Sequence, residues 1–180
     1  MWLRIARRTP TTAVTAGIAV VEGRVVAVDR TLSIPGSPSR PVFHDTAFES
    51  YRAVPGGRGR AAWQVDRIDR QIVPFLIEDE AGQILIHADR EEVEVKGGRR
   101  EVGTTGKNAT GRYSARMIFP GDVVRVRGEA FEPKRSPVPR GLRATADRPL
   151  EILFRKEGSP PAEPVAAPEP QRAARKKRKK

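Results

Sequence analysis

Two short apolar segments flank an acidic turn near the middle of the chain, and they carry the clearest secondary-structure signal. Residues 72–78 and 83–88 alternate apolar side chains with the period of two that is typical of strands. The connection at residues 79–82 predicts a three-residue hairpin loop that ends on glycine, which adopts left-handed conformations without a Cβ clash. The buried face of this antiparallel hairpin is expected to hold Phe75, Ile77, Ile84 and Ile86.

Further strands follow from β-branched density and from the same alternation. Residues 17–29 are rich in valine and predict either two strands or one long bent strand, with Gly23 placed at a bulge or bend. Residues 122–131 and 150–155 predict the last two main strands. Together with the hairpin they make five main strands, which suit a small Greek-key barrel of the OB type.

A second hairpin is predicted between the first two strands of the barrel. Residues 41–51 and 61–70 both alternate, and the glycine-rich segment 55–60 between them is typical of a loop. Residues 88–95 predict a turn and a short strand, whereas 96–110 is rich in glycine, threonine and lysine and is expected to be mobile. The expected fold is all-β: an OB-like Greek-key barrel with an inserted β-hairpin and a disordered basic C-terminal tail.

Composition and charge change towards both ends of the chain. Residues 1–11 form a basic lead-in, 12–157 the barrel with its insertion, and 158–180 a Pro/Ala linker with a Lys/Arg-rich tail. The formal net charge is +12; seven basic against two acidic residues give 159–180 a net of +5, which leaves +7 for 1–158. Such a tail is expected to attract nucleic acid or an anionic membrane. The residues expected to bind polyanions are Arg125, Arg127, Arg172, Arg175, Lys176, Lys177, Arg178, Lys179 and Lys180.

Composition also excludes several kinds of chemistry. The chain has no cysteine, which rules out disulfides, thiol catalysis and zinc sites built on thiolates. Its two histidines, His44 and His87, would need Asp45 or Asp89 to complete a metal site, and their spacing does not favour one. The glycines and lysines of 96–107 lack the spacing of a phosphate-binding loop. We therefore expect no catalytic residue, metal, cofactor or small-molecule substrate.

The acidic turn of the first hairpin has two interpretations. Glu78, Asp79 and Glu80 form a carboxylate cluster of a kind that binds metals or serves in acid–base chemistry. The simpler interpretation is a solvated turn in which Asp79 accepts hydrogen bonds from backbone amides of the loop. We favour the structural interpretation.

Arginines on the barrel leave a further pair of interpretations open. Arg24, Arg125 and Arg127 are expected on an outer face, with Arg67 and Arg70 nearby. There they either follow a phosphate backbone or are ordinary solvated charges. The aromatic side chains available to stack on bases are Tyr51, Trp63 and Tyr113.

The sequence predicts no membrane helix. The most apolar segment, residues 13–28, is interrupted by Glu22, Gly23 and Arg24, and no run approaches the roughly 20 residues that a membrane helix needs. Residues 1–8 lack the apolar region of a signal peptide. We expect a cytoplasmic protein that would reach a membrane by association only.

Several segments, taken in order, match one known domain. Residues 21–25 (Val-Glu-Gly-Arg-Val) are similar to its opening strand, and 34–44 to the entry of its hairpin. Trp63 matches a tryptophan on the return strand. Residues 74–82 are similar to a Pro-Phe-hydrophobic-hydrophobic-Glu-Asp-x-x-Gly signature, and 118–128 to a late strand in which a glycine-led turn precedes a valine-rich run.

On these motifs residues 18–155 resemble the GIDE domain, or beside-a-membrane domain, of mitochondrial membrane-anchored ubiquitin ligases and their bacterial relatives. The Phe-x-x-x-Asp-x-x-Gly hairpin also occurs in nucleic-acid-binding OB-folds, so the order of the motifs and Trp63 carry the resemblance. Family members commonly have transmembrane helices, and the ligases have a RING, whose cysteine ligands are absent here; ligase activity is therefore not implied. The structural signature comprises Gly23, Trp63, Pro74, Phe75, Asp79, Gly82, Gly121 and Gly128.

The resemblance implies a non-catalytic interaction module that acts at or near a membrane or a membrane-bound partner protein of unknown identity. Its basic tail would bind nucleic acid or anionic lipid. The alternative is an OB-fold nucleic-acid-binding protein that uses a basic face of the barrel together with the tail.

Overall fold

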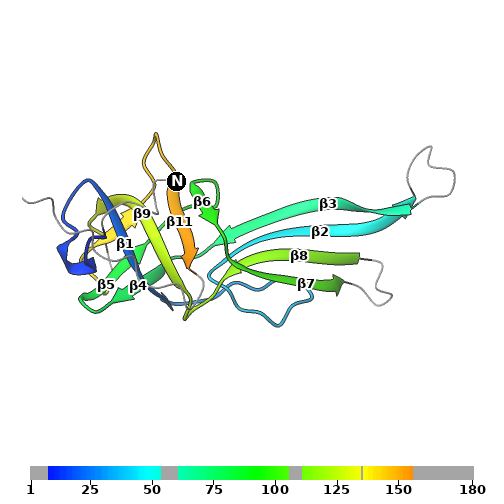
Figure 1. The fold of residues 1–180 in the computed structure, drawn as a ribbon, viewed down its shortest axis with the longest axis horizontal. Coiled ribbons are helices and arrows are strands. Elements are labelled where there is room, and N and C mark those ends of the chain that lie inside the picture. Colours follow the sequence, from blue (N-terminus) through cyan, green and yellow to red (C-terminus); the bar gives the residue numbers. More distant parts are fainter. Residues whose placement is uncertain (1–7, 54–60, 106–110, 135, 156–180) are drawn as a thin grey trace, which may run out of the picture.

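The computed structural model describes residues 8–53, 61–105, 111–134 and 136–155, which form two β-sheets joined end to end (Figure 1). One sheet closes into a barrel, and the other projects from one end of the barrel as a long arm. In the described part of the chain the only helical element is a short 3₁₀ turn at Thr11–Ala13. No helix there is long and apolar enough to cross a membrane.

The barrel is a closed ring of strands in the order β1-β4-β5-β10-β9, with β9 pairing back to β1. Neighbouring strands are antiparallel, except that β5 and β10 run parallel. This arrangement confirms the predicted all-β barrel of the OB type. The strands are β1 (Ile18–Ala27), β4 (Phe75–Asp79), β5 (Gly82–Ile86), β9 (Val123–Phe131) and β10 (Gly141–Arg143).

The β4–β5 hairpin lies where the alternating pattern predicted it. All four side chains of its expected core face are buried in the barrel interior, together with valines from β1 and β9. The turn itself is shorter than predicted: Asp79 pairs with Gly82, so the loop has two residues, Glu80 and Ala81. Gly82, with φ of 153°, thus belongs to the ladder of β5 rather than to the loop.

The prediction that residues 150–155 form the fifth strand of the barrel is wrong in one respect. They do form a strand, β11 (Leu150–Arg155), which pairs with β9. However, β10 pairs with the same edge of β9 and also with β5, so β10 closes the ring. Residues 144–149 leave the sheet between the two strands, and β11 pairs onward in parallel with β6 (Val93–Lys96). A three-residue strand is too short to produce a readable alternation.

Gly23 does not lie at a bulge, which was one of its two predicted roles. The pairing of β1 with β9 runs without interruption from Ile18 to Arg24, so β1 has no bulge there. Instead, a Cβ at Gly23 would lie 2.2 Å from the backbone oxygen of Glu78 in β4. Glycine is needed because the two strands approach closely where β1 passes from β9 to β4.

The arm is a four-stranded antiparallel sheet in the order β3-β2-β8-β7. The predicted hairpin is confirmed as β2 and β3, but 96–110 is not simply a mobile segment, because it contains β7. The four strands are β2 (Phe43–Ala53), β3 (Ala61–Ile72), β7 (Arg99–Thr105) and β8 (Gly111–Ile118). Glycine, threonine and arginine dominate β7, so its own composition predicts no strand; pairing with β8 supplies the order.

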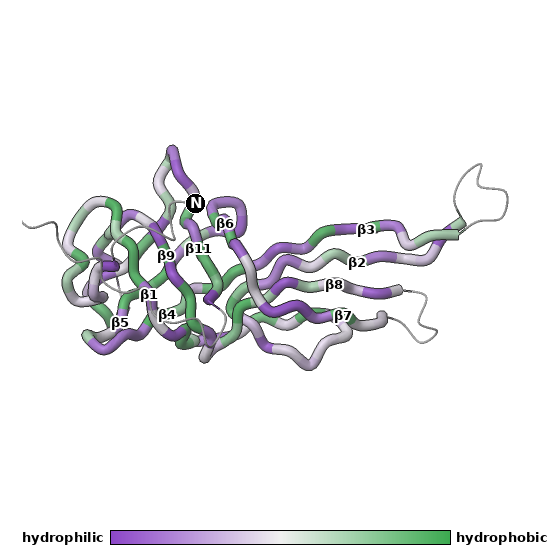
Figure 2. The backbone as a smooth tube through the Cα atoms, viewed as in Figure 1, coloured by the Kyte–Doolittle hydropathy of each residue, from purple (hydrophilic) through white to green (hydrophobic). Residues whose placement is uncertain are grey.

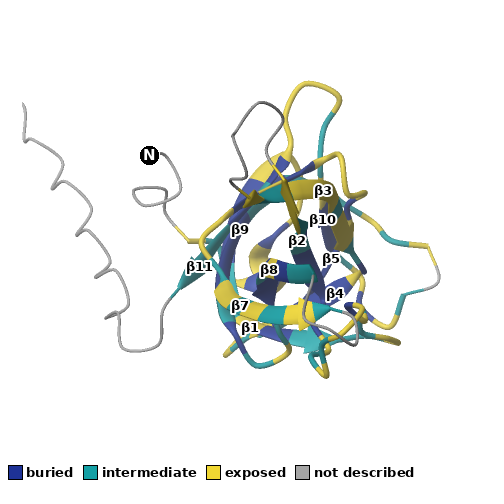
Figure 3. Ribbon diagram, turned by 90° about the vertical axis from the view of Figure 1, so that its right-hand side faces the viewer, coloured by how far each residue is buried: buried dark blue, intermediate teal, exposed yellow. Residues whose placement is uncertain are grey.

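One face of the arm is buried, as the view along its length shows (Figure 3). The connection between β1 and β2 brings Ile34 onto that face, where it packs on Phe48, Tyr113, Ala115 and Met117. Glu101 holds the connection in place by accepting hydrogen bonds from Ser37 Oγ, Ser39 Oγ and the Tyr113 hydroxyl. The arm therefore has its own small core, separate from that of the barrel.

Asp122 joins the arm to the barrel. Its carboxylate is buried, accepts the amide hydrogen of Phe119 at 2.8 Å, and accepts a hydrogen bond from Arg99 Nε at 2.7 Å. Arg99 begins β7 and Asp122 precedes β9, so a single ion pair fixes the base of the arm against the rim of the barrel.

Candidate interaction surface

The β4–β5 outer face, where OB-type barrels commonly bind oligonucleotides, is covered here. Leu76 and Leu85 point outwards from these strands and are 6% and 9% exposed. They pack with Val138, which lies in the connection between β9 and β10, and with Val26, Val28 and Phe131. This apolar cluster covers Leu76 and Leu85 on that face of the hairpin.

The acidic turn serves the structure of the hairpin. Asp79 Oδ1 accepts the amide hydrogens of Ala81 and Gly82 at 2.9 and 3.0 Å, as the structural interpretation predicted. It also accepts a hydrogen bond from Thr11 Oγ1 at 2.7 Å, while Oδ2 accepts the amide hydrogen of Thr11 at 2.9 Å. Burial tends to raise the pKa of the Asp79 carboxyl, but these hydrogen bonds outweigh it, so the pKa lies below its ordinary value. Asp79 thus fastens the 3₁₀ turn to the barrel.

The two histidines lie in different parts of the molecule. His44 is buried in β2, with Thr46 Oγ1 3.0 Å from its Nδ1, whereas His87 follows β5, is exposed, and packs against Phe131. Burial lowers the pKa of His44, although Asp69 and Asp45 partly counteract it. Within the described ranges no three His, Asp or Glu side chains are grouped to hold a metal ion.

Arg125 does not lie on an exposed basic face, so the structure contradicts that prediction. Its side chain is 2% exposed, and its Nε donates to Glu22 Oε2 at 2.7 Å. The alternation was right in pointing Arg125 away from the barrel interior, which Val124 and Val126 fill. Pattern alone could not show that the outer side is also covered there. A buried arginine already paired with a carboxylate is not available to a polyanion.

The other barrel arginines do not form a stripe. Arg127 is a quarter exposed and lies 3.6 Å from Glu151 Oε1, while Arg24 donates to the backbone oxygen of Gly121. Arg67 and Arg70 lie on β3 in the arm, where Arg67 covers the ring of Phe48. The expected basic face of the barrel is thus dispersed into separate local contacts. The tail residues from Arg172 to Lys180 lie outside the described residues.

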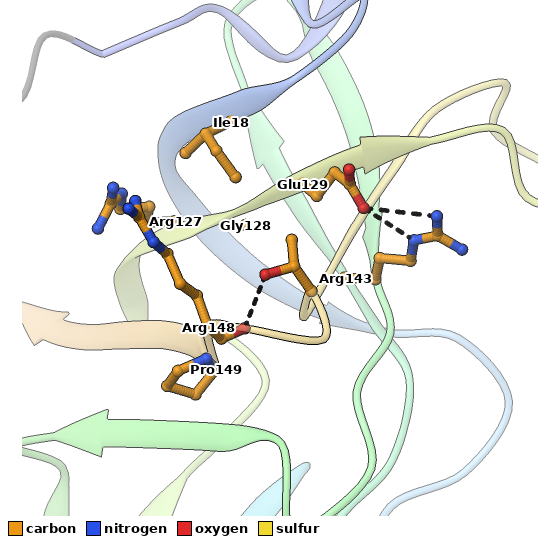
Figure 4. A pocket seen from close by; sticks show the side chains of 8 residues that line it. Ile18, Arg127, Gly128, Glu129, Arg143, Arg148 and Pro149 are labelled. Carbon is orange, nitrogen blue, oxygen red and sulfur yellow. Dashed lines mark hydrogen bonds and ion pairs between the residues drawn. The ribbon is translucent and has the colours of Figure 1, made fainter.

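Arg127 also lines a small pocket beside the segment 144–149, which connects β10 and β11 (Figure 4). Its volume is about 10 Å³, which admits about one water molecule. The carboxylate of Glu129 pairs with Arg143 at its edge. A wider depression of about 430 Å³ lies where β3 meets the barrel; the four charged residues in its lining, Arg30, Asp89, Arg90 and Glu91, are all exposed. Neither cavity has a buried polar group that would orient a small molecule.

No described element packs on the second face of the arm, and we call this face the open face. Cross-strand register places its residues in rows across the sheet, because directly paired residues point to the same side. It begins one row beyond Phe43, Ile72 and Ile118, which pack at the barrel core, and runs towards the tip of the arm. The open face consists of Asp45, Ala47, Glu49, Tyr51, Trp63, Val65, Ile68, Arg70, Arg100, Val102, Thr104, Arg112, Ser114 and Arg116.

Aliphatic side chains on the open face are unusually exposed. Val65, Ile68 and Val102 are 55%, 69% and 69% exposed, and Tyr51 is 55% exposed. Figure 2 shows the hydropathy of β3, in which green apolar residues interrupt a mainly polar strand. Ile68 and Val102 lie at opposite ends of one row on the two outer strands, with the small side chains of Ala47 and Ser114 between them.

Arginines surround these aliphatic side chains. Next to the barrel, Arg70 and Arg116 share one oxygen of Asp45, Oδ2, at 3.0 and 2.8 Å, and Arg100 follows in the same row. Towards the tip, Arg112 pairs with Glu49 and lies 4.5 Å from the centre of the Trp63 ring. The face thus holds four arginines against two carboxylates, an excess of two positive charges.

Trp63 is the one signature residue on this surface. It packs at a centroid distance of 5.4 Å against Tyr51, so one side is occupied by Tyr51 and another by Arg112. The remaining signature residues shape turns and close strand contacts: Pro74 precedes β4, Gly121 has a positive φ before β9, and Gly128 leaves no room for a Cβ beside Leu150.

Sequence reasoning missed the part of the open face that β7 supplies. Arg100 and Val102 gain neighbours only through the pairing of β7 with β8, and 99–105 carries no strong strand signal. The one usable signal was on β3, where Val65 and Ile68 interrupt a polar run.

Comparisons with protein-family models, with curated proteins and with solved structures find no match for this chain, so its resemblance to the GIDE domain stays a prediction.

Proposed function

We propose that this chain is a non-catalytic interaction module, in which an OB-type barrel presents an arm that binds a partner protein at or near a membrane. The observation that carries the proposal is the open face, where exposed aliphatic side chains are framed by arginines. Apolar side chains of a sheet are normally buried against another element, and an exposed apolar surface rimmed by polar residues marks an interaction site.

The basic tail supports a location near an anionic surface. Residues 159–180 carry seven Lys or Arg, and all of them lie between Arg172 and Lys180. Lysine and arginine near an anionic bilayer contribute about 1 kcal/mol each, and salt weakens the attraction. The tail would hold the module at the membrane, and the arm would select the partner.

An OB-fold nucleic-acid binder is the less favoured function. The β4–β5 outer face is covered by the cluster around Val138, and Arg125 is buried against Glu22. The first feature covers the hairpin face on which OB-type barrels commonly bind oligonucleotides, and the second removes Arg125 from the basic face on which the alternative depended.

Co-sedimentation with vesicles tests the proposal. The full chain is compared with a variant in which Lys176, Lys177, Arg178, Lys179 and Lys180 are replaced by Gln, using vesicles with and without phosphatidylserine. We expect binding only to the anionic vesicles, weakened by salt, and at least about tenfold weaker for the variant. Binding that the Gln variant retains in full, or that neutral vesicles match, would contradict the membrane part of the proposal.

A salt series with single-stranded oligonucleotides tests the alternative. Tight binding by the Gln variant, at physiological salt, would favour the nucleic-acid function over the proposed one.

A further inference from the structure

We propose that the open face docks an acidic amphipathic helix of a partner protein; this inference rests on the interaction module proposed above. Three observations carry it: the exposed aliphatic row, the width of that row, and the uncompensated positive charge beside it.

The row that runs from Ile68 to Val102 sets the shape of the occupant. Its two ends lie on the outer strands β3 and β7, three strand spacings of about 4.8 Å apart, or roughly 14 Å. Between them the short side chains of Ala47 and Ser114 rise less above the sheet. A helix about 10 Å across fits between the larger side chains and rests on the smaller ones.

The row beside the barrel sets the charge of the occupant. Asp45 serves both Arg70 and Arg116, and in the described part of the chain no carboxylate lies within ion-pair distance of Arg100. Two positive charges of this face are therefore unbalanced. Acidic side chains at one end of the docked helix would lie over this row while its aliphatic stripe covers Ile68 and Val102.

The same charges argue against other occupants. A second copy docked face to face would oppose two faces that each have an excess of two positive charges. The chain's own residues 159–180 have a net charge of +5 and would be repelled as well.

A nucleic acid is disfavoured for a different reason. Asp45 and Glu49 would face the phosphates of the nucleic acid and repel them. The exposed aliphatic side chains have no group that binds a phosphate. The Trp63 ring is already packed against Tyr51 and Arg112, so it is a poor platform for a base.

The fluorescence emission of Trp63 reports binding to the open face. The sequence has two tryptophans, so Trp2→Phe in the full chain leaves Trp63 as a single fluorescent reporter within the open face. The probes are two synthetic helical peptides that share one leucine stripe and carry either glutamate or lysine at all other positions. We expect the glutamate peptide to shift the emission saturably, and the lysine peptide to bind at least about tenfold more weakly.

Substitutions on the face and matched controls locate the site. Val102→Asp and Arg100→Glu alter exposed side chains of β7, and each should weaken the glutamate peptide about tenfold. Ile18→Asp and Arg148→Glu make the same changes at exposed positions on the barrel and should leave the Kd unchanged. Equal losses on both surfaces, or none at Val102→Asp, would overturn the docking site.

Three further outcomes would also overturn it: equal affinity for the lysine peptide, displacement of the glutamate peptide by a single-stranded oligonucleotide in an Arg100-dependent way, or self-association abolished by Val102→Asp. The vesicle experiment is independent. Vesicle binding without peptide binding would refute only the docking of an acidic helix. Peptide binding without vesicle binding would refute only the membrane part of the proposed function.

Discussion

Arg125 Nε donates a hydrogen bond to Glu22 Oε2 across 2.7 Å, joining β9 to β1 on the outside of the barrel. Both side chains are nearly inaccessible, at 2% and 8% exposed. Arg8 lies 3.3 Å from the second oxygen of Glu22, so the same carboxylate also holds the described start of the chain against the barrel. The ion pair of Arg125 and Glu22 therefore stabilises the barrel.

Removing one member of this pair should be more harmful than removing both. Arg125→Met leaves Glu22 buried without its main partner, and we expect a loss of about 3 kcal/mol in the free energy of unfolding. The double variant with Glu22→Gln should recover part of that loss because no buried charge then remains unpaired. Urea unfolding of the single and double variants measures the difference; a double variant no more stable than Arg125→Met would contradict the penalty expected for an unpaired buried charge.

Asp79 should make the stability of the barrel depend on acid pH. Asp79→Asn replaces an ionised acceptor of four hydrogen bonds and should cost about 2 kcal/mol at neutral pH. The folded-state pKa of this carboxyl lies below its unfolded value, so its contribution is complete above the unfolded pKa and is lost as pH falls through the folded pKa.

Unfolding measured at several pH values tests this directly. The difference between the parent and Asp79→Asn should be largest near neutral pH and should shrink below about pH 4. A difference that persists unchanged at low pH would show that shape, and not charge, determines the role of Asp79.

Gly23 should tolerate no side chain. Gly23→Ala would place Cβ 2.2 Å from the Glu78 backbone oxygen, so β1 and β4 must separate, and we expect a loss of about 3 kcal/mol or more. Gly17→Ala is a matched control: its φ is +71°, yet nothing lies within 4 Å of the added Cβ, so only about 1 kcal/mol of backbone strain is expected. Thermal melts of both variants separate steric crowding from strain, and equal losses would contradict this account.

Tyr113 and Glu101 should shift each other's pKa in opposite directions at the buried face of the arm. Burial raises the pKa of the Tyr113 hydroxyl, and its hydrogen bond to Glu101 raises it further. The hydrogen bonds from Ser37, Ser39 and Tyr113 in turn lower the pKa of Glu101.

An ultraviolet titration in the Tyr51→Phe background, which leaves Tyr113 as the sole tyrosine, measures this hydroxyl. Its pKa should exceed the ordinary value of about 10, and Glu101→Gln should lower it again without returning it fully, because burial remains. An unchanged pKa in Glu101→Gln would contradict the hydrogen bond.

The barrel hairpin could be predicted from the sequence, because alternation and the choice of turn residues depend only on neighbouring positions in the chain. Alternation alone places Phe75 and Ile77 on one face of their strand, and Ile84 and Ile86 on one face of theirs. Asp79 had a backbone amide within reach in any tight turn. The same reasoning identified β1, β9 and the β2–β3 hairpin.

Tertiary structure alone decided which of these features is available to a partner. Arg125 and Arg100 carry the same side chain on strands of the same protein, yet one is buried against Glu22 and the other is exposed on the outer strand of the arm. Burial depends on what packs against a strand. β10 closes the ring by pairing with β5, which is distant in sequence, whereas β7 takes its order from the hairpin that it forms with β8. Alternation gives the side of a strand on which a residue lies, and only the assembled sheets determine whether that side is covered.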